Sequence, residues 1–180
     1  MLYMFFANGF EEVEAIAALD VIRRAGIEIK SVGIGSASVT GSHGITVICD
    51  LTDADINGFD GLEGVILPGG MPGTLNLFNN ETVIKSVEFC AANGLLLAAI
   101  CAAPLILGRM NLLDGKEAVC FPGFEDELKG AKISDNFVCT SDNVVTAKGM
   151  GSAVNFGIAI VAYFKGQDYA DSLKSGLQCS

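Results

Sequence analysis

The sequence is poor in positive charge, in histidine and in paired cysteines. Eleven Lys and Arg residues stand against 21 Asp and Glu, a formal net charge of −10. No basic cluster is available to neutralise phosphates, so we expect no nucleic-acid partner. His43 is the only histidine, and a Cys–His catalytic pair would have to use it. The six cysteines lack C-x-x-C spacing, which indicates neither a metal site nor a redox pair.

Long apolar runs are also missing. No stretch approaches the roughly 20 apolar residues of a membrane span. The amino-terminal run 2–7 ends at Asn8-Gly9 and has no basic flank, so it does not match a signal peptide. We therefore expect a soluble, cytoplasmic protein with reduced thiols and no membrane partner. Because 51% of the residues are hydrophobic and only 18% are charged, apolar surface is expected to enter a subunit interface.

The chain alternates short apolar runs with amphipathic segments. Strands are predicted at 2–7, 28–35, 41–50, 64–67 and 95–100, a hairpin at 138–147, and helices at about 12–25, 81–93, 104–109 and 151–165. This alternation is typical of an α/β protein whose mostly parallel sheet is covered on both faces. No linker or repeat interrupts it, and one domain spanning 1–180 is expected.

Three turns follow predicted strands, and the carboxyl ends of strands are where open α/β sheets bind ligands. They are residues 8–14, 68–70 and 101–104. Cys101 ends the most apolar strand and precedes a helix that has Pro104 in its first turn. Such an elbow lifts the sulfur out of the sheet. The helix amino terminus would stabilise a thiolate, and nearby amides could hold an oxyanion. The alternative is a packing cysteine.

Glu14 lies on the apolar side of the first helix at about 100° per residue. A carboxyl there should have a raised pKa, and it could exchange protons with a neighbouring thiol. The alternative is a first-turn glutamate facing solvent. Gly69-Gly70 could direct amides at a carbonyl oxygen, or it could be only a tight turn. His43, in a glycine-flanked turn, could be an exposed loop residue.

Several segments occur in a recognisable order: A-N-G-F-E-E-V-E-A (7–15), D-V-I-R-R-A-G-I (20–27), L-P-G-G (67–70), A-A-I-C-A-A-P (98–104), C-F-P-G (120–123) and K-G-M-G-S (148–152). Together they resemble the ThiJ/PfpI superfamily, in the branch of the parkinsonism-associated deglycase and its bacterial relatives. The resemblance implies a flavodoxin-like three-layer α/β/α sandwich, a class I glutamine amidotransferase-like domain that usually forms homodimers. No cofactor or metal is implied.

The resemblance also assigns roles. It implies that Cys101 is the nucleophile, Glu14 its acidic partner, and the amides of Gly70 and Ala102 the oxyanion pocket. Gly69 would line the site. Cys49 would match an interface cysteine, and His43 would lie near the dimer interface and could approach the partner's site.

Two residues depart from relatives. Phe121, which the resemblance implies could line the site, stands where the deglycase has a histidine, so a third, histidine member of the catalytic set is missing. Ala102 stands where the protease-like branch has a histidine, which ranks protease or amidase activity low.

These residues lead to a cysteine-dependent enzyme acting on small reactive carbonyls or glycation adducts, a cofactor-independent glyoxalase or deglycase active in stress protection. Two alternatives involve no turnover. Cys101 could be an oxidation sensor whose sulfenic or sulfinic acid is stabilised by a nearby carboxyl. The protein could instead be a chaperone-like dimer in which Cys101 has no catalytic role.

Overall fold

The computed structural model describes residues 1–179. The strands of its main sheet are β1 (Leu2–Phe6), β2 (Ile29–Gly33), β5 (Leu51–Thr52), β6 (Gly64–Leu67), β7 (Leu96–Ile100), β10 (Val138–Ser141) and β11 (Val144–Ala147). The sheet has seven strands in the order β10-β11-β7-β6-β1-β2-β5. All neighbours are parallel except β10 and β11, which form the expected antiparallel hairpin.

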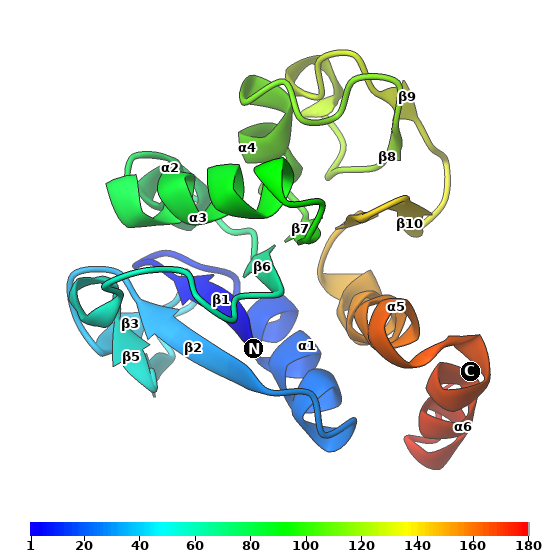
Figure 1. Cartoon of the computed structure of the whole chain (residues 1–180), viewed down its shortest axis with the longest axis horizontal. Helices are drawn as coiled ribbons and strands as arrows, with labels where there is room; N and C mark the ends of the chain where they lie inside the picture. The colour runs from blue at the N-terminus through cyan, green and yellow to red at the C-terminus, as the bar shows by residue number, and fades with distance from the viewer. Residues whose placement is uncertain (180) are drawn as a thin grey trace.

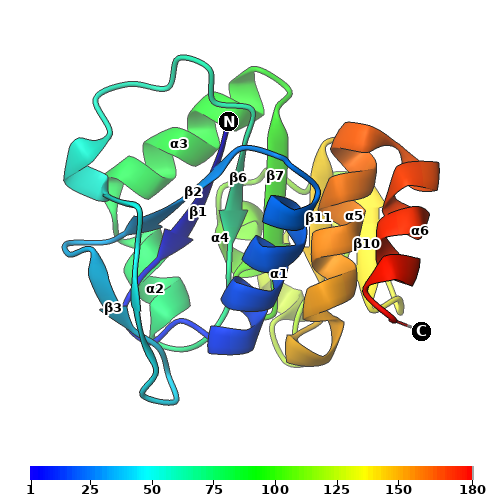
Figure 2. The ribbon, with the colours of Figure 1, turned by 90° about the horizontal axis from the view of Figure 1, so that it is seen from below.

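Helices cover both faces of this sheet. They are α1 (Glu12–Arg24), α2 (Gly73–Phe78), α3 (Glu81–Ala92), α4 (Pro104–Arg109), α5 (Ala153–Lys165) and α6 (Gln167–Gly176). Helices α2, α3 and α4 lie on one side, α1 and α5 lie on the other, and α6 packs outside α5 (Figures 1 and 2). The predicted flavodoxin-like α/β/α sandwich with a mostly parallel sheet is confirmed.

Strand β1 shows why an unbroken apolar run forms the centre of the sheet. Tyr3 and Phe5 belong to the core under α3 and α4, whereas Leu2, Met4 and Phe6 belong to the core under α1 and α5. Successive side chains of a strand point to opposite faces, so a strand covered by helices on both faces needs apolar residues at every position.

The segment 41–50 differs from the prediction of one strand. Only β4 (Thr46–Ile48) is extended there, and it pairs antiparallel with β3 (Ser38–Thr40) outside the main sheet. Gly44, at φ +83°, makes the turn that interrupts the run. That left-handed backbone conformation suits glycine.

Several elements were not predicted because each is short or carries few apolar residues. They are helices α2 and α6, the paired strands β8 (Glu117–Ala118) and β9 (Lys132–Ile133), and the 3₁₀ turns η1 (Asp53–Asp55), η2 (Glu125–Glu127) and η3 (Met150–Ser152). Helix α6 has one buried residue, Ala170, so its apolar signal is weak.

Among residues 1–179, no helix is both long and apolar enough to cross a membrane. Strands β1, β6 and β7 are adjacent and parallel, so the turns that follow them meet at one edge of the sheet. These are the three turns that the sequence singled out.

Candidate active site

Cys101 occupies a sharp elbow between β7 and α4. Its φ is +64°, one of few positive values at a non-glycine residue here. Its amide donates to the Ala147 carbonyl (2.9 Å), and its carbonyl accepts from the Phe121 amide (2.8 Å). Left-handed backbone costs a residue with a Cβ about 1 kcal/mol or more, and such strain clusters at functional sites. The sheet and the 121 segment together hold the cysteine in this conformation.

Glu14 is buried on the inner face of α1, with 1% of its surface exposed. Its Oε2 accepts a hydrogen bond from the Gly69 amide (3.0 Å), and its own amide donates to the Glu11 carboxylate (2.7 Å), which caps the helix. The expectation that Glu14 faces the apolar side is confirmed. A first-turn glutamate facing solvent is therefore the wrong alternative.

A glycine at position 69 is required for the Glu14 carboxyl to lie this close to Cys101. A Cβ at residue 69 would lie 2.5 Å from Glu14 Oε2 and 2.6 Å from the Cys101 Cβ, distances that side chains do not tolerate. Gly69 was expected only to line the site. Instead, the Gly69 amide donates a hydrogen bond to Glu14, and the absence of a side chain at Gly69 lets the Glu14 carboxyl reach Cys101.

Backbone amides face the sulfur from two turns. The amides of Gly70 and Ala102 both act to lower the pKa of Cys101 through hydrogen bonds. Gly70, at φ +89°, also lies where a Cβ would meet the backbone of residues 9–11. The predicted pair of amides therefore does converge on the cysteine, where it can stabilise negative charge on sulfur or on an oxygen bonded next to it.

The electrostatics differ from the preformed thiolate that the sequence suggested. Burial, the charge of Glu14 and its hydrogen bond raise the pKa of Cys101 to about 12, against the two amides. Burial and the charge of Glu11 raise the pKa of Glu14 to about 7, although Cys101 and the Gly69 amide oppose the rise. Above that pH an ionised carboxylate sits beside a neutral thiol. The pair is thus a base and an acid in contact, and α4, only six residues long, does not ionise the sulfur.

A general base works best when its pKa is near the working pH. Glu14 meets this condition and contacts the group whose proton it would take. Once it holds that proton, its negative charge no longer opposes a thiolate, and the two amides then favour the charged sulfur. The site can therefore release a nucleophilic sulfur at the moment of attack.

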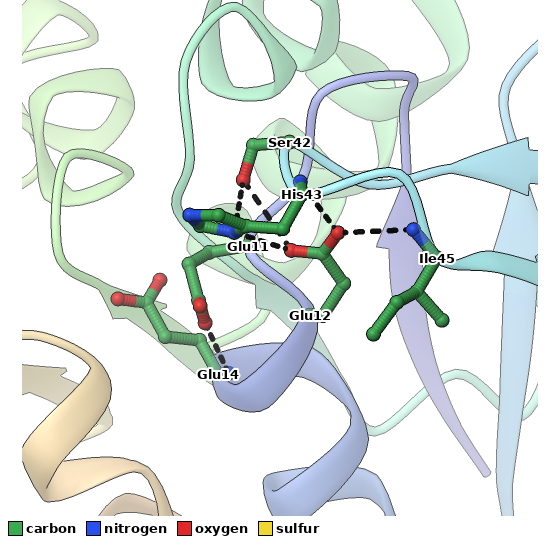
Figure 3. Close-up of polar contacts among 6 residues, drawn as sticks. All are labelled: Glu11, Glu12, Glu14, Ser42, His43 and Ile45. Carbon is green, nitrogen blue, oxygen red and sulfur yellow. Dashed lines mark hydrogen bonds and ion pairs between the residues drawn. The ribbon is translucent and has the colours of Figure 1, made fainter.

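The only histidine, His43, contacts the carboxylate of Glu12 and not that of Glu14. His43 Nδ1 is 2.9 Å from Glu12 Oε2, the His43 amide donates to Oε1 at 2.7 Å, and the Ile45 amide donates at 3.4 Å. Figure 3 shows Glu12 turned toward this loop and Glu14 turned away from it. Burial acts to raise the pKa of Glu12, but these bonds outweigh it and lower the pKa to about 2. His43 is an exposed loop residue that covers Glu12 and does not line the Cys101 site of its own chain.

Glu11, Glu12 and His43 form the one convergent group of metal-ligating side chains among residues 1–179, with ligand atoms within 4.8 Å of one another. Both oxygens of Glu12 already accept hydrogen bonds from the 42–45 loop. The cluster is therefore explained as a loop anchor. Sequence patterns did not predict this cluster, because nothing local marks Glu12 as buried.

The His43→Ala variant tests this placement. We expect turnover by the Cys101 site to change less than about threefold, because the exposed His43 side chain binds Glu12 and does not line the Cys101 site. Amide hydrogen exchange in the 41–45 loop should become faster, since one of the contacts that hold the loop to Glu12 is lost. Lys85→Ala removes a similarly exposed basic side chain, which pairs with Glu81, and should leave the loop unchanged. A tenfold loss of turnover in His43→Ala would contradict this assignment.

Phe121 and Gly149 also border the site. A Cβ at residue 149 would lie 3.3 Å from the Phe121 ring and 3.9 Å from Glu14 Oε1. The expectation that Phe121 is near the site is met, whereas Gly149 was not singled out. Its only signal was the glycine-rich segment 148–152.

The six cysteines are all free. Cys49, Cys90, Cys120 and Cys139 are buried, and burial is the first cause that raises each of their pKa values. Cys101 and Cys179 are partly exposed. Of these two, only Cys101 has a carboxyl partner and inward-facing amides.

Comparisons with known proteins agree with this architecture. A family model described as the DJ-1/PfpI family matches residues 1–163. The chain is 33% identical over 173 residues to protein DJ-1 homolog A of Arabidopsis thaliana, covering 94% of this chain and 44% of that protein. It is 29% identical over 165 residues to the glutathione-independent glyoxalase DJR-1.2 of Caenorhabditis elegans, covering 91% and 87%. The solved structure of oxidized Toxoplasma gondii DJ-1 has 28% identity and a TM-score of 0.92, covering 99% and 98%.

The chain spans less than half the length of the two Arabidopsis relatives, 44% of one and 38% of the other.

Proposed function

The chain belongs to the DJ-1/PfpI family, and from that membership and the contact between Glu14 and Cys101 we propose that it is a cysteine-dependent, cofactor-independent glyoxalase. Its substrates are small α-oxoaldehydes such as methylglyoxal, and its role is protection against reactive carbonyls. The observation that carries the proposal is a buried carboxyl of pKa about 7 in hydrogen-bond contact with an elbow cysteine. The named glyoxalase among the relatives supports it.

The reaction begins with addition of the thiol. Sγ of Cys101 attacks the aldehyde carbon as Glu14 accepts the thiol proton, and the carbonyl oxygen takes up negative charge. The Gly70 and Ala102 amides stabilise that oxygen. Return of the proton to it gives a neutral hemithioacetal and restores the Glu14 carboxylate.

Glu14 then moves a second proton. The carboxylate removes the hydrogen from the former aldehyde carbon, and the ketone oxygen takes up the negative charge of the resulting enediolate. The hydroxyl proton on the former aldehyde carbon passes to that oxygen, and Glu14 delivers the proton that it took to the former ketone carbon. The product is a thioester of the α-hydroxy acid, in which the aldehyde carbon has been oxidised and the ketone carbon reduced. Water hydrolyses the thioester, releasing the acid and the free thiol. The sum is oxoaldehyde plus water to hydroxy acid, so no external oxidant or reductant is consumed.

A deglycase reaction uses the same two groups. On an early glycation adduct, the sulfur displaces the amine from the carbinolamine carbon, and Glu14 delivers the thiol proton to the leaving nitrogen. The resulting hemithioacetal then follows the path described above.

The direct test is conversion of methylglyoxal to lactate by the purified chain, without glutathione and with a chelator present. We expect catalytic turnover and one lactate enantiomer in excess, because a fixed carboxyl reprotonates one face of the enediol. Loss of methylglyoxal without lactate, or racemic lactate at the uncatalysed rate, would contradict the proposal.

Redox sensing is the second candidate, favoured by the partial exposure of Cys101 beside a carboxyl that can stabilise a sulfinic acid. A hydroperoxide would oxidise the thiol to sulfenic acid with loss of an alcohol or water, and a second equivalent would give the sulfinic acid. A thiol pKa near 12 disfavours spontaneous oxidation, because the thiolate is the reactive form. Oxidation of Cys101 alone under mild peroxide, with no carbonyl turnover, would favour this candidate.

We propose that a second copy of the chain covers the outer face of α1 and β4. Val13, Ile16, Ile45 and Ile48 are large apolar side chains exposed there, and they border two adjoining hollows. Exposed apolar patches of this kind mark interaction surfaces. Cys49 borders one of these hollows, in keeping with its expected place at the interface. A reducing cytoplasm is the compartment that suits the free thiols.

Ile48→Asp tests the homodimer. Ile48 is 76% exposed in the single chain, so the charge should not disturb folding. In a twofold-symmetric interface the change occurs twice, and we expect the dimer dissociation constant to rise at least about a hundredfold. Light scattering coupled to size exclusion measures it. Ile133→Asp, on β9 at 49% exposure, is the control. If both substitutions weakened the dimer equally, the proposal that the α1 and β4 face forms the interface would be refuted.

A further inference from the structure

A further apolar hollow lies beside the active site, next to Gly149. It has a volume of about 320 Å³ and is lined by Phe121, Pro122, Phe137, Lys148, Met150 and Ser152, with Gly149 and Gly151 between them. Ligand pockets begin at about 300 Å³. An engineered cavity of about 150 Å³ already binds benzene, so an aromatic ring fits in the space available.

Large apolar side chains that are exposed to solvent form the walls of the hollow. Phe121 is 48% exposed, Phe137 70% and Met150 55%. Lys148 lies with its ammonium 5.6 Å from the centroid of the Phe137 ring, a contact that favours a fixed ring position. Aromatic rings and a methionine together form a surface suited to a flat apolar group.

Gly149 lies between this hollow and the reacting groups. Its absent side chain leaves the space between the Phe121 ring and Glu14 Oε1, since a Cβ there would lie 3.3 Å and 3.9 Å from them. The Phe121 amide is bonded to the Cys101 carbonyl (2.8 Å), so the aromatic wall is tied to the elbow. The turn after Gly149 is closed by Ser152, whose hydroxyl donates to the Gly149 carbonyl (2.7 Å).

We propose that this hollow is a specificity pocket for the apolar, preferably aromatic, arm of an α-oxoaldehyde. Phe121, Phe137 and Met150 would contact the arm, which would reach them past Gly149, while the aldehyde carbon reacts at Cys101. The inference rests on the proposed function and deepens it by naming the substrate class. A phenyl arm would fill the hollow, whereas the methyl group of methylglyoxal would leave most of it empty.

The kinetic test compares kcat/KM for phenylglyoxal and methylglyoxal. We expect the wild type to prefer phenylglyoxal, and Phe137→Ala and Met150→Ala each to lower the phenylglyoxal-to-methylglyoxal ratio about tenfold, since hydrophobic pocket contacts discriminate on that scale. Ile133→Ala, a comparably exposed residue outside the lining, should leave the ratio unchanged. An unaltered ratio in both pocket variants would overturn the proposal.

Gly149→Ala tests the opening itself. Gly149 has φ 162°, an extended conformation that alanine adopts, so folding should be retained. The added methyl narrows the passage between Phe121 and Glu14, and the ratio should fall at least about fivefold because the larger arm must pass it. Equal effects on both substrates would indicate a disturbed Glu14 and would count against an opening for the arm.

A binding measurement separates this pocket from the catalytic proposal. The chain contains no tryptophan, so Phe137→Trp introduces a single indole reporter into the hollow. Mandelate, the phenylglyoxal product, should shift its emission at concentrations where lactate does not. Binding of mandelate without turnover of either oxoaldehyde would support the pocket while the glyoxalase proposal failed.

The reverse result also discriminates. Methylglyoxal turnover with no mandelate binding and no phenylglyoxal preference would overturn the pocket and leave the glyoxalase proposal standing. Light scattering of Phe137→Ala completes the test. A changed molecular mass would identify the hollow as a contact between copies of the chain and would also overturn the substrate pocket.

Discussion

Replacing Cys101 by serine should lower methylglyoxal turnover at least about a thousandfold, because a hydroxyl is a far weaker nucleophile than a sulfur whose proton has moved to Glu14. Lactate formation under the same conditions as for the wild type measures the loss. The elbow and its partners are unchanged by the substitution, so the far-ultraviolet circular dichroism should match that of the wild type.

The matched control is Cys179→Ser, which alters the other partly exposed thiol. It should retain wild-type turnover, because the Cys179 thiol lies near the carboxyl end, where it donates to the Leu177 carbonyl. Equal losses in both variants would mean that thiol content in general, and not the elbow, consumes methylglyoxal. The strained backbone offers a further check. Cys101→Gly should be inactive yet at least as stable as Cys101→Ser, since glycine adopts φ +64° without strain.

Replacing Glu14 by glutamine should lower kcat by about a hundredfold to ten-thousandfold, the usual contribution of a positioned general base. Glutamine keeps the hydrogen bond from the Gly69 amide but accepts no proton from the thiol. In the wild type, kcat/KM should rise as the pH increases through about 7, where Glu14 ionises, and this step should be absent in Glu14→Gln. Glu88→Gln, on the exposed face of α3, is the control. A kcat that is unchanged in Glu14→Gln would remove Glu14 from the mechanism.

The same substitution should change the pH dependence of stability. The pKa of Glu14 is raised in the folded chain from 4.5 to about 7. Proton binding by Glu14 therefore stabilises the folded state fully below pH 4.5, and this stabilisation is lost as the pH rises to about 7. Over that window the free energy of unfolding of Glu14→Gln should increase relative to the wild type by up to about 3 kcal/mol, with no further relative change above it. Urea unfolding of both proteins at pH 4.5 and pH 8 measures this difference.

The sequence alone predicted the layered fold and the centre of the site. The apolar runs that became β1, β6 and β7 need burial on both faces, and the helices between them carry one apolar stripe each. These are local patterns, and a parallel sheet is the arrangement that satisfies them. Because parallel strands end at one edge, the turns at Glu14, Gly70 and Cys101 had to meet.

Other elements could not be predicted in this way. The strand expected over 41–50 became β4 and a glycine turn, because the hairpin with β3 depends on contacts outside the main sheet. Glu12 and Glu14 are two residues apart in the same first turn of α1. Local periodicity placed only Glu14 on the apolar face, and Glu12 is buried because the loop carrying His43 folds over it.

The protonation of the site was likewise decided by tertiary structure. The sequence suggested a thiolate held by a helix end, whereas burial and the contact with Glu14 keep the Cys101 thiol neutral and make Glu14 the base. The order of residues determined which groups meet, since strand and helix periods act over a few positions. Only the folded chain decided which of them holds the proton and which hollow opens beside them, because burial, charge and the space left by Gly149 arise from segments far apart in the sequence.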